Sequence, residues 1–74
     1  MMAAHTVRGD VAGRVWKVVA SPGEHVAAED TLVIIESMKM EIPVVAPASC
    51  TVTAILVVEG QEVREDEEIA RISP

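Results

Sequence analysis

The sequence has few aromatic residues, leucines and lysines. Its 74 residues include one tryptophan, no tyrosine, no phenylalanine, two leucines and two lysines. The longest apolar runs are only a few residues long, whereas a membrane-spanning helix needs roughly 18 or more. A chain this short buries about 60% of the surface that its unfolded form exposes, so its core is thin and a deep catalytic cleft is not expected. These features predict a protein with no membrane span, and they argue against an enzyme.

Basic side chains and cysteine are also scarce. Six Lys and Arg against 12 Asp and Glu give a formal net charge of −6, and the basic residues are scattered along the chain. Binding to phosphate backbones needs clustered basic side chains, so DNA and RNA are not expected as partners. The single cysteine, Cys50, cannot form an internal disulfide, and the first residues do not read as a secretory signal. We therefore expect a cytoplasmic protein with a buried, inert Cys50.

β-Branched residues make up a large part of the sequence. Val, Ile and Thr occupy 23 of the 74 positions, in short runs separated by turn residues. Such residues pack well on a pleated sheet, and this spacing is typical of a sandwich or barrel. Irregular alternation in Gly13–Val19 and in Val33-Ile34-Ile35 indicates β-bulges or strands that are covered on both faces, and we expect Trp16 to pack. Strands are expected at His5–Val7, Gly13–Val19, Thr31–Ser37, Met40–Val45, Ser49–Val57 and Glu68–Ile72.

An internal repeat is visible when each residue is compared with the residue 37 positions later. Apolar positions then coincide: Val15 with Val52, Val26 with Val63, Leu32 with Ile69 and Ile35 with Ile72. The repeated unit, about residues 12–36 and 49–73, is a strand, a glycine turn, an inward valine, an acidic turn and a strand. Neither half could bury its apolar face alone. We therefore expect residues 1–74 to form one all-β domain, a flattened barrel or sandwich of two halves related by a pseudo-two-fold axis.

The junction between the two repeats, Ser37–Glu41, has no counterpart within the chain, because that counterpart would lie past Pro74. This predicts a hairpin tip at one end of the body, with the chain termini near the other. Lys39 at the tip would hold its amine in water, as a target for a modifying enzyme rather than as a catalyst. Met38 and Met40 on either side would present a flexible apolar surface that different partners could pack against.

The segment Glu36-Ser37-Met38-Lys39-Met40-Glu41 resembles the attachment sequence of the biotinyl/lipoyl domain family. The likeness covers nearly the whole chain: it includes Ala46-Pro47 at the start of the second half, the turn Val58–Val63 and the two-copy layout. The chain is most similar to the small stand-alone biotinylated proteins of that family. The resemblance implies the fold called a barrel-sandwich hybrid, with the attachment hairpin at one end.

The resemblance also implies a function. A biotin protein ligase would join biotin to Lys39, and the tethered biotin would carry a carboxyl group between a biotin carboxylase and a carboxyltransferase. The chain would then be a carrier without catalytic residues, whose tether replaces free diffusion by a high effective concentration. Met38 and Met40 would contact the partner enzymes, with a role as core residues that point back into the body as the alternative. Glu36 and Glu41 would position the hairpin or meet basic residues of the ligase, although plain solvated charge is the simpler interpretation.

Two other functions remain open. A lipoyl carrier has the same fold and uses a lysine at the same position, but lipoyl domains typically show Asp-Lys-Ala at the tip. Met38-Lys39-Met40 therefore favours biotin. An unmodified binding or adaptor module could also have this fold, but that role does not explain why methionines bracket Lys39.

A few positions depart from the family pattern. Glu29 and Asp66 stand in acidic turns where the family usually has glycine, and if those turns need a positive φ, Asp tolerates it better than Glu. Cys50 falls on Gly13 in the repeat, at a position that the family often fills with glycine. The two histidines have no partners at metal-ligand spacing, so no metal site is expected.

Overall fold

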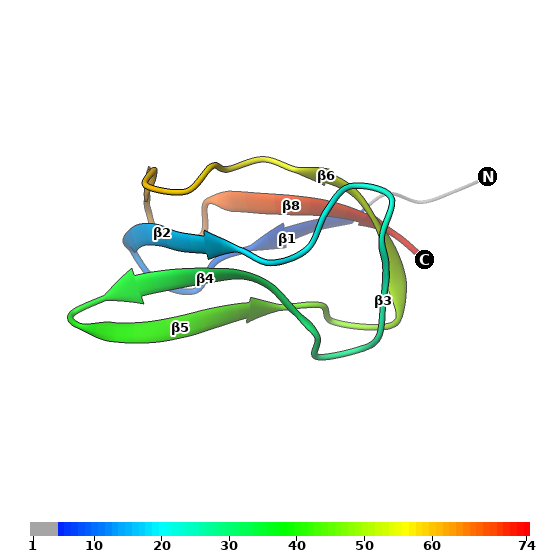
Figure 1. Cartoon of the computed structure of the whole chain (residues 1–74), viewed down its shortest axis with the longest axis horizontal. Coiled ribbons are helices and arrows are strands. Elements are labelled where there is room, and N and C mark those ends of the chain that lie inside the picture. Colours follow the sequence, from blue (N-terminus) through cyan, green and yellow to red (C-terminus); the bar gives the residue numbers. More distant parts are fainter. Residues whose placement is uncertain (1–4) are drawn as a thin grey trace.

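The computed structural model describes residues 5–74, which form two four-stranded antiparallel sheets. The sheets have the strand orders β1-β8-β6-β3 and β5-β4-β2-β7 and pack face to face as a flattened sandwich (Figure 1). The expected all-β fold is thereby confirmed. Within residues 5–74 no helix is long and apolar enough to cross a membrane. The strands are β1 (His5–Arg8), β2 (Gly13–Val18), β3 (His25–Val26), β4 (Thr31–Ser37), β5 (Met40–Val45), β6 (Cys50–Ile55), β7 (Glu62–Val63) and β8 (Glu68–Ser73).

The internal repeat relates one sheet to the other. A shift of 37 residues converts β2, β3 and β4 into β6, β7 and β8, and β1 into the end of β5, so the strand order of one sheet becomes that of the other. The halves also complete each other, since β3 pairs with β6 and β7 pairs with β2. The predicted inward positions are buried in both halves: Val15, Val26, Leu32, Ile35, Val52, Val63, Ile69 and Ile72.

The six longer strands lie where the sequence predicted them, with ends that differ by a residue or two. The two-residue strands β3 and β7 were not predicted as strands. Two residues are too few to show an alternating pattern, so only their inward valines were visible in the sequence. Figure 1 shows the turn between β4 and β5 at one end of the molecule and Pro74 at the other, as expected.

The irregular alternation in β2 does mark a β-bulge. Its register against β4 shifts between Val15 and Lys17, which makes Trp16 the extra residue. The side chain of Trp16 is 48% exposed, so it packs against the rest of the protein only in part. A bulge re-aims the side chain of its extra residue, and here it places Trp16 on the outer face of the sheet. A second register shift lies between Thr31 and Val33, near the other predicted irregularity.

The two acidic turns have the backbone conformation that glycine favours. Glu29 has φ 70° and Asp66 has φ 68°. Each turn is held by a backbone hydrogen bond to the other half, from Glu29 N to Ala46 O and from Asp66 N to Gly9 O, both 2.8 Å. The left-handed region costs a residue with a Cβ atom roughly 1–2 kcal/mol. The body therefore keeps a strained residue in each half.

This strain gives a testable prediction for Glu29. Glu29→Gly should raise the free energy of unfolding by about 0.5–1 kcal/mol, because relief of the left-handed strain exceeds the entropy that glycine adds to the unfolded chain. Urea unfolding followed by circular dichroism measures the change. The neighbour Ala28, which is exposed and has no positive φ, is the matched control: Ala28→Gly should lower stability. A loss of stability in Glu29→Gly would contradict the account.

Candidate functional site

The β4–β5 hairpin ends in a two-residue turn formed by Met38 and Lys39. Ser37 pairs with Met40 across this turn, and the φ angles of Met38 and Lys39 are 52° and 67°. Two positive φ values are the mark of a type I′ turn, whose twist matches that of the strands and which usually contains asparagine and glycine. Met38 and Lys39 have Cβ atoms, so each is strained by roughly 1 kcal/mol. Strain of this kind is found mostly at functional positions.

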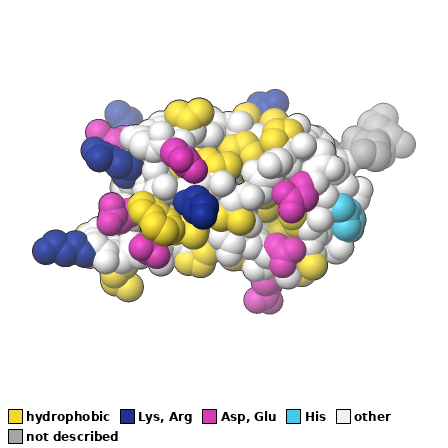
Figure 2. Space-filling view, viewed as in Figure 1, with side chains coloured by type: hydrophobic (Ala, Val, Ile, Leu, Met, Phe, Trp, Pro, Cys, Tyr) yellow, Lys and Arg dark blue, Asp and Glu magenta, His cyan; other side chains and the backbone are white. Residues whose placement is uncertain are grey.

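The side chains of the turn point into solvent. Met38 is 92% exposed and Met40 is 63% exposed, although methionine is an apolar residue. Lys39 is exposed, and within the described part of the chain its amine makes no hydrogen bond or ion pair. Figure 2 shows a basic side chain projecting from the hairpin end of the molecule. The lysine is thus available to another molecule without breaking any interaction of the fold.

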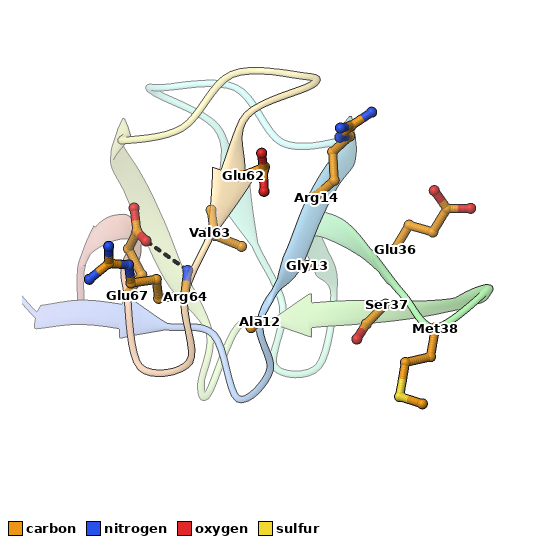
Figure 3. A pocket seen from close by; sticks show the side chains of 10 residues that line it. All are labelled: Ala12, Gly13, Arg14, Glu36, Ser37, Met38, Glu62, Val63, Arg64 and Glu67. Carbon is orange, nitrogen blue, oxygen red and sulfur yellow. Dashed lines mark hydrogen bonds between the residues drawn. The ribbon is translucent and has the colours of Figure 1, made fainter.

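Charged side chains form a row at the base of the hairpin. Glu36 on β4 pairs with Glu41 on β5, and on its other side it pairs with Arg14 on β2. Two like charges directly opposite each other are unfavourable, and the neighbouring guanidinium offsets that repulsion. Arg14 was missed from the sequence, because the register that places it beside Glu36 passes through the bulge at Trp16. In Figure 3 Arg14 and Glu36 point away from Ser37 and Met38.

A groove of about 820 Å³ lies beside the hairpin base, and Arg14 and Glu36 are among the residues that line it (Figure 3). Ser37 and Met38 line one side of it and Arg64 and Glu67 line the other. The Glu67 carboxylate accepts a 2.8 Å hydrogen bond from the Arg64 backbone amide, which fixes the turn between β7 and β8. No histidine or cysteine lines the groove. It therefore offers no pairing of a nucleophile with an imidazole base.

One serine–histidine contact lies among the described residues, at β3 and β6. The His25 ring has Nε2 3.4 Å from Ser49 Oγ and Nδ1 3.3 Å from Thr51 Oγ1. In a catalytic triad the second ring nitrogen faces a carboxylate, whereas here it faces a hydroxyl. Cys50 on the same strand is buried, as expected. Residues 5–74 contain no group of three or more His, Cys, Asp or Glu side chains that could hold a metal ion.

Comparison with known protein families places this hairpin in context. Residues 2–72 match the biotin/lipoyl family, which is described as "biotin-requiring enzyme". The chain belongs to the biotin/lipoyl family. Its relatives include a biotinylated protein TB7.3 homolog of Mycobacterium leprae, 40% identical over 95% of this chain and 99% of the relative. A biotin/lipoyl attachment protein of Bacillus subtilis is 38% identical over 92% of this chain and 93% of the relative.

Solved structures of two carboxylases contain a part with the same fold. A domain in a single-chain, multi-domain long-chain acyl-CoA carboxylase superposes on 95% of this chain with a TM-score of 0.90 and 30% identity. A domain in the urea carboxylase of Kluyveromyces lactis gives a TM-score of 0.90 with 40% identity over 95% of this chain. This chain spans only 7% and 6% of the lengths of those two carboxylases.

The residues present fit covalent attachment of biotin, which requires an accessible primary amine. Both lysines, Lys17 and Lys39, are exposed. Lys17 lies within β2 and pairs with Ile34 of β4, so it lies on the face of a sheet. Lys39 lies in a turn at the end of the molecule, where an active site can enclose it. Of the two amines, that of Lys39 is the one that projects from an end of the molecule.

Proposed function

We propose that this protein is a biotin carrier in which Lys39 holds biotin through an amide bond. The observation that carries the proposal is the position of Lys39: an unpaired amine in an exposed two-residue turn, between two exposed methionines, in a chain of the biotin/lipoyl family. Glu36 and Glu41 give the base of the hairpin a negative charge that favours partners with basic surfaces.

A biotin protein ligase would form the bond from the mixed anhydride of biotin and AMP. The Lys39 Nζ attacks the acyl carbon, the new C–N bond forms as the bond from that carbon to the phosphate oxygen breaks, and AMP leaves. The nitrogen releases its proton to solvent or to the ligase. The chain supplies the nucleophile alone, because no general base lies beside Lys39 in the described structure.

The carrier role follows from the shape of the molecule. Bound biotin supplies a ureido nitrogen that accepts and releases a carboxyl group. The chain's own residues hold the attachment turn at one end of the two-sheet body, with Pro74 at the opposite end (Figure 1). The partners would be a biotin carboxylase and a carboxyltransferase, and a tether that reaches both sites converts transfer between them into a local event. We infer no catalytic residue in this chain.

The direct test is the intact mass of the protein after incubation with a biotin protein ligase, ATP and biotin, followed by peptide mapping. The expected result is a gain of one biotin less one water on the peptide that contains Lys39. Modification of Lys17 instead would contradict the assignment. A parallel incubation with a lipoate ligase and lipoate tests the lipoyl alternative, which the name of the Bacillus subtilis relative keeps open.

Met38 gives a second test, which separates function from stability. Met38→Asn should leave the free energy of unfolding unchanged or raise it by about 0.5–1 kcal/mol, because asparagine tolerates the left-handed conformation and an exposed side chain loses little packing. The same change should slow ligation or carboxyl transfer, because it removes the apolar contact beside Lys39. Thermal unfolding and the rate of biotin incorporation measure the two effects. A less stable protein with normal ligation and transfer would show that Met38 serves only the fold.

A further inference from the structure

The outer face of the sheet β5-β4-β2-β7 carries a row of apolar side chains that crosses three strands. Ile34 on β4 pairs with Pro43 on β5 and with Lys17 on β2, and the bulge places Trp16 next to Lys17. We call Trp16, Ile34 and Pro43 the apolar row. Trp16 and Pro43 are exposed and Ile34 is half-buried. Figure 2 shows hydrophobic side chains on this face with acidic side chains around them.

The internal repeat shows that the fold does not require this row to be apolar. The equivalent positions on the opposite sheet, 37 residues away in the sequence, are Thr53, Arg71 and Thr6. The geometry there is the same: Arg71 pairs with Thr6 and Ala54, and a register shift makes Thr53 the extra residue of a bulge. The same backbone thus carries polar side chains on one face and apolar ones on the other. A requirement other than folding must explain the difference.

The apolar row adjoins the charged row at the base of the hairpin. That row extends from Glu62 through Arg14 and Glu36 to Glu41, two residues closer to the turn than Ile34 and Pro43. Glu59 lies at the other side, where its carboxylate accepts a 3.3 Å hydrogen bond from the backbone amide of Val18. Four carboxylates therefore border the face, against the positive charges of Arg14 and Lys17. A partner that covers the face needs an apolar patch with a surplus of basic side chains around it.

Two of the strands that carry the apolar row, β4 and β5, end in the turn that holds Lys39. An enzyme that encloses the turn in its active site must lie next to one of the flanks of this hairpin. We propose that the apolar row is the surface on which a biotin protein ligase docks, through an apolar patch bordered by basic side chains. This inference rests on the function proposed above for Lys39.

A ligase is a better candidate than a carboxylase for docking on the apolar row, because the two enzymes obtain their affinity for this chain from different groups. Carboxylase and carboxyltransferase sites receive a chain that already carries biotin, and they can bind the biotin itself. The ligase must recognise the chain before any biotin is attached, so its affinity for this substrate comes from the chain's own side chains. Docking on the apolar row would also cover Lys17, which is exposed within it. The ligase would then reach Lys39 and leave Lys17 unmodified.

Within the row, Trp16 should contribute most to binding. Tryptophan is enriched among the few interface residues whose truncation costs most of the affinity. Trp16 is the only tryptophan in the sequence. About half of its side chain is exposed to solvent, so truncating it should leave the packing of the core intact. We expect its loss to raise the KM of the ligase for this protein roughly tenfold or more. The kcat should not change, because Trp16 does not touch the reacting amine.

The repeat supplies variants that the fold is known to accommodate. Trp16→Thr and Ile34→Arg each copy the residue at the equivalent position of the opposite face, and Thr53→Ala on that face is the matched control. The experiment measures kcat and KM for biotin incorporation into the full chain by a biotin protein ligase with ATP and biotin. Thermal unfolding of each variant confirms that it is folded. We expect a higher KM for the two apolar-row variants and the wild-type KM for Thr53→Ala.

Two further readings make the test decisive. KM should rise with salt concentration for the wild type, because charge attraction between exposed surfaces is screened. With 5-fluorotryptophan at Trp16, the single fluorine resonance should shift or broaden when ligase is added in excess. A wild-type KM in both Trp16→Thr and Ile34→Arg, or an unchanged fluorine resonance, would overturn the proposal that the ligase docks on the apolar row. This holds even if the two variants slow carboxyl transfer. Failure of the wild-type chain to gain biotin on Lys39 would instead overturn the proposed function, and this inference with it.

Discussion

Lys39→Arg should abolish the covalent uptake of biotin while leaving stability within about 0.5 kcal/mol of the wild type. Arginine keeps the positive charge and the approximate length of the side chain, and the side chain of Lys39 is exposed and makes no hydrogen bond or ion pair within residues 5–74. A guanidinium remains protonated and is a poor nucleophile toward an acyl group. Intact mass after incubation with ligase, ATP and biotin should therefore show no increment, and the denaturation curve should overlay that of the wild type.

The second lysine is the control for this experiment. Lys17→Arg should take up one biotin, as the wild type does, because Lys17 lies within β2 and away from the turn. Uptake of biotin by Lys39→Arg would show that another group accepts it and would refute the assignment of Lys39. Loss of biotin uptake in both Lys39→Arg and Lys17→Arg would show that ligation also requires a lysine at position 17.

Gly13→Ala should have the largest effect on stability. A Cβ atom at Gly13 would overlap the backbone oxygen of Glu36 and would lie 2.9 Å from Cγ2 of Ile35. The first contact is with backbone, which cannot rotate away, so β2 and β4 must separate at the base of the hairpin. Overpacking of this kind costs about 1–3 kcal/mol or more, which is a large part of the stability of a small domain. Urea unfolding should show a loss of at least about 2 kcal/mol.

The repeat provides the control here too. Cys50 is the counterpart of Gly13 and is buried, so the opposite half already accommodates a Cβ atom at this position. Cys50→Ala removes only the sulfur and should cost roughly 1 kcal/mol, as expected for a small buried group. Equal losses in Gly13→Ala and Cys50→Ala would show that the close approach of β2 to β4 is not needed.

Much of the fold could be predicted from the sequence, because it depends on patterns that repeat. The inward positions, such as Val15 with Val52, follow from period-two alternation and are fixed twice over by the two halves. The hairpin at Lys39 follows from the same repeat, because it joins one copy to the next. Its flanking residues could be selected by type alone, since exposed methionines beside a lysine are unusual.

What could not be predicted depends on register and on backbone dihedral angles. The bulge in β2 changes which side chain faces outward, so the sequence did not show that half of Trp16 is exposed. Arg14 lies next to Glu36 only through a pairing that long-range packing determines. The strain in Met38 was also hidden, because a residue type does not by itself report a positive φ; at Glu29 a positive φ was considered only because the family usually has glycine there.

The symmetry of the body also bears on how the molecule could be re-engineered. The partner of the Met38–Lys39 turn under the pseudo-two-fold relation is the break between β8 and β1, which pair side by side at His5 and Ile72. A short linker from Pro74 to His5 that replaced residues 1–4 would close this break into a second hairpin. The backbone could then be cut at another turn, such as the one at Gly60. If the linker contained a Met-Lys-Met sequence, the permuted protein would display two attachment lysines that face in opposite directions.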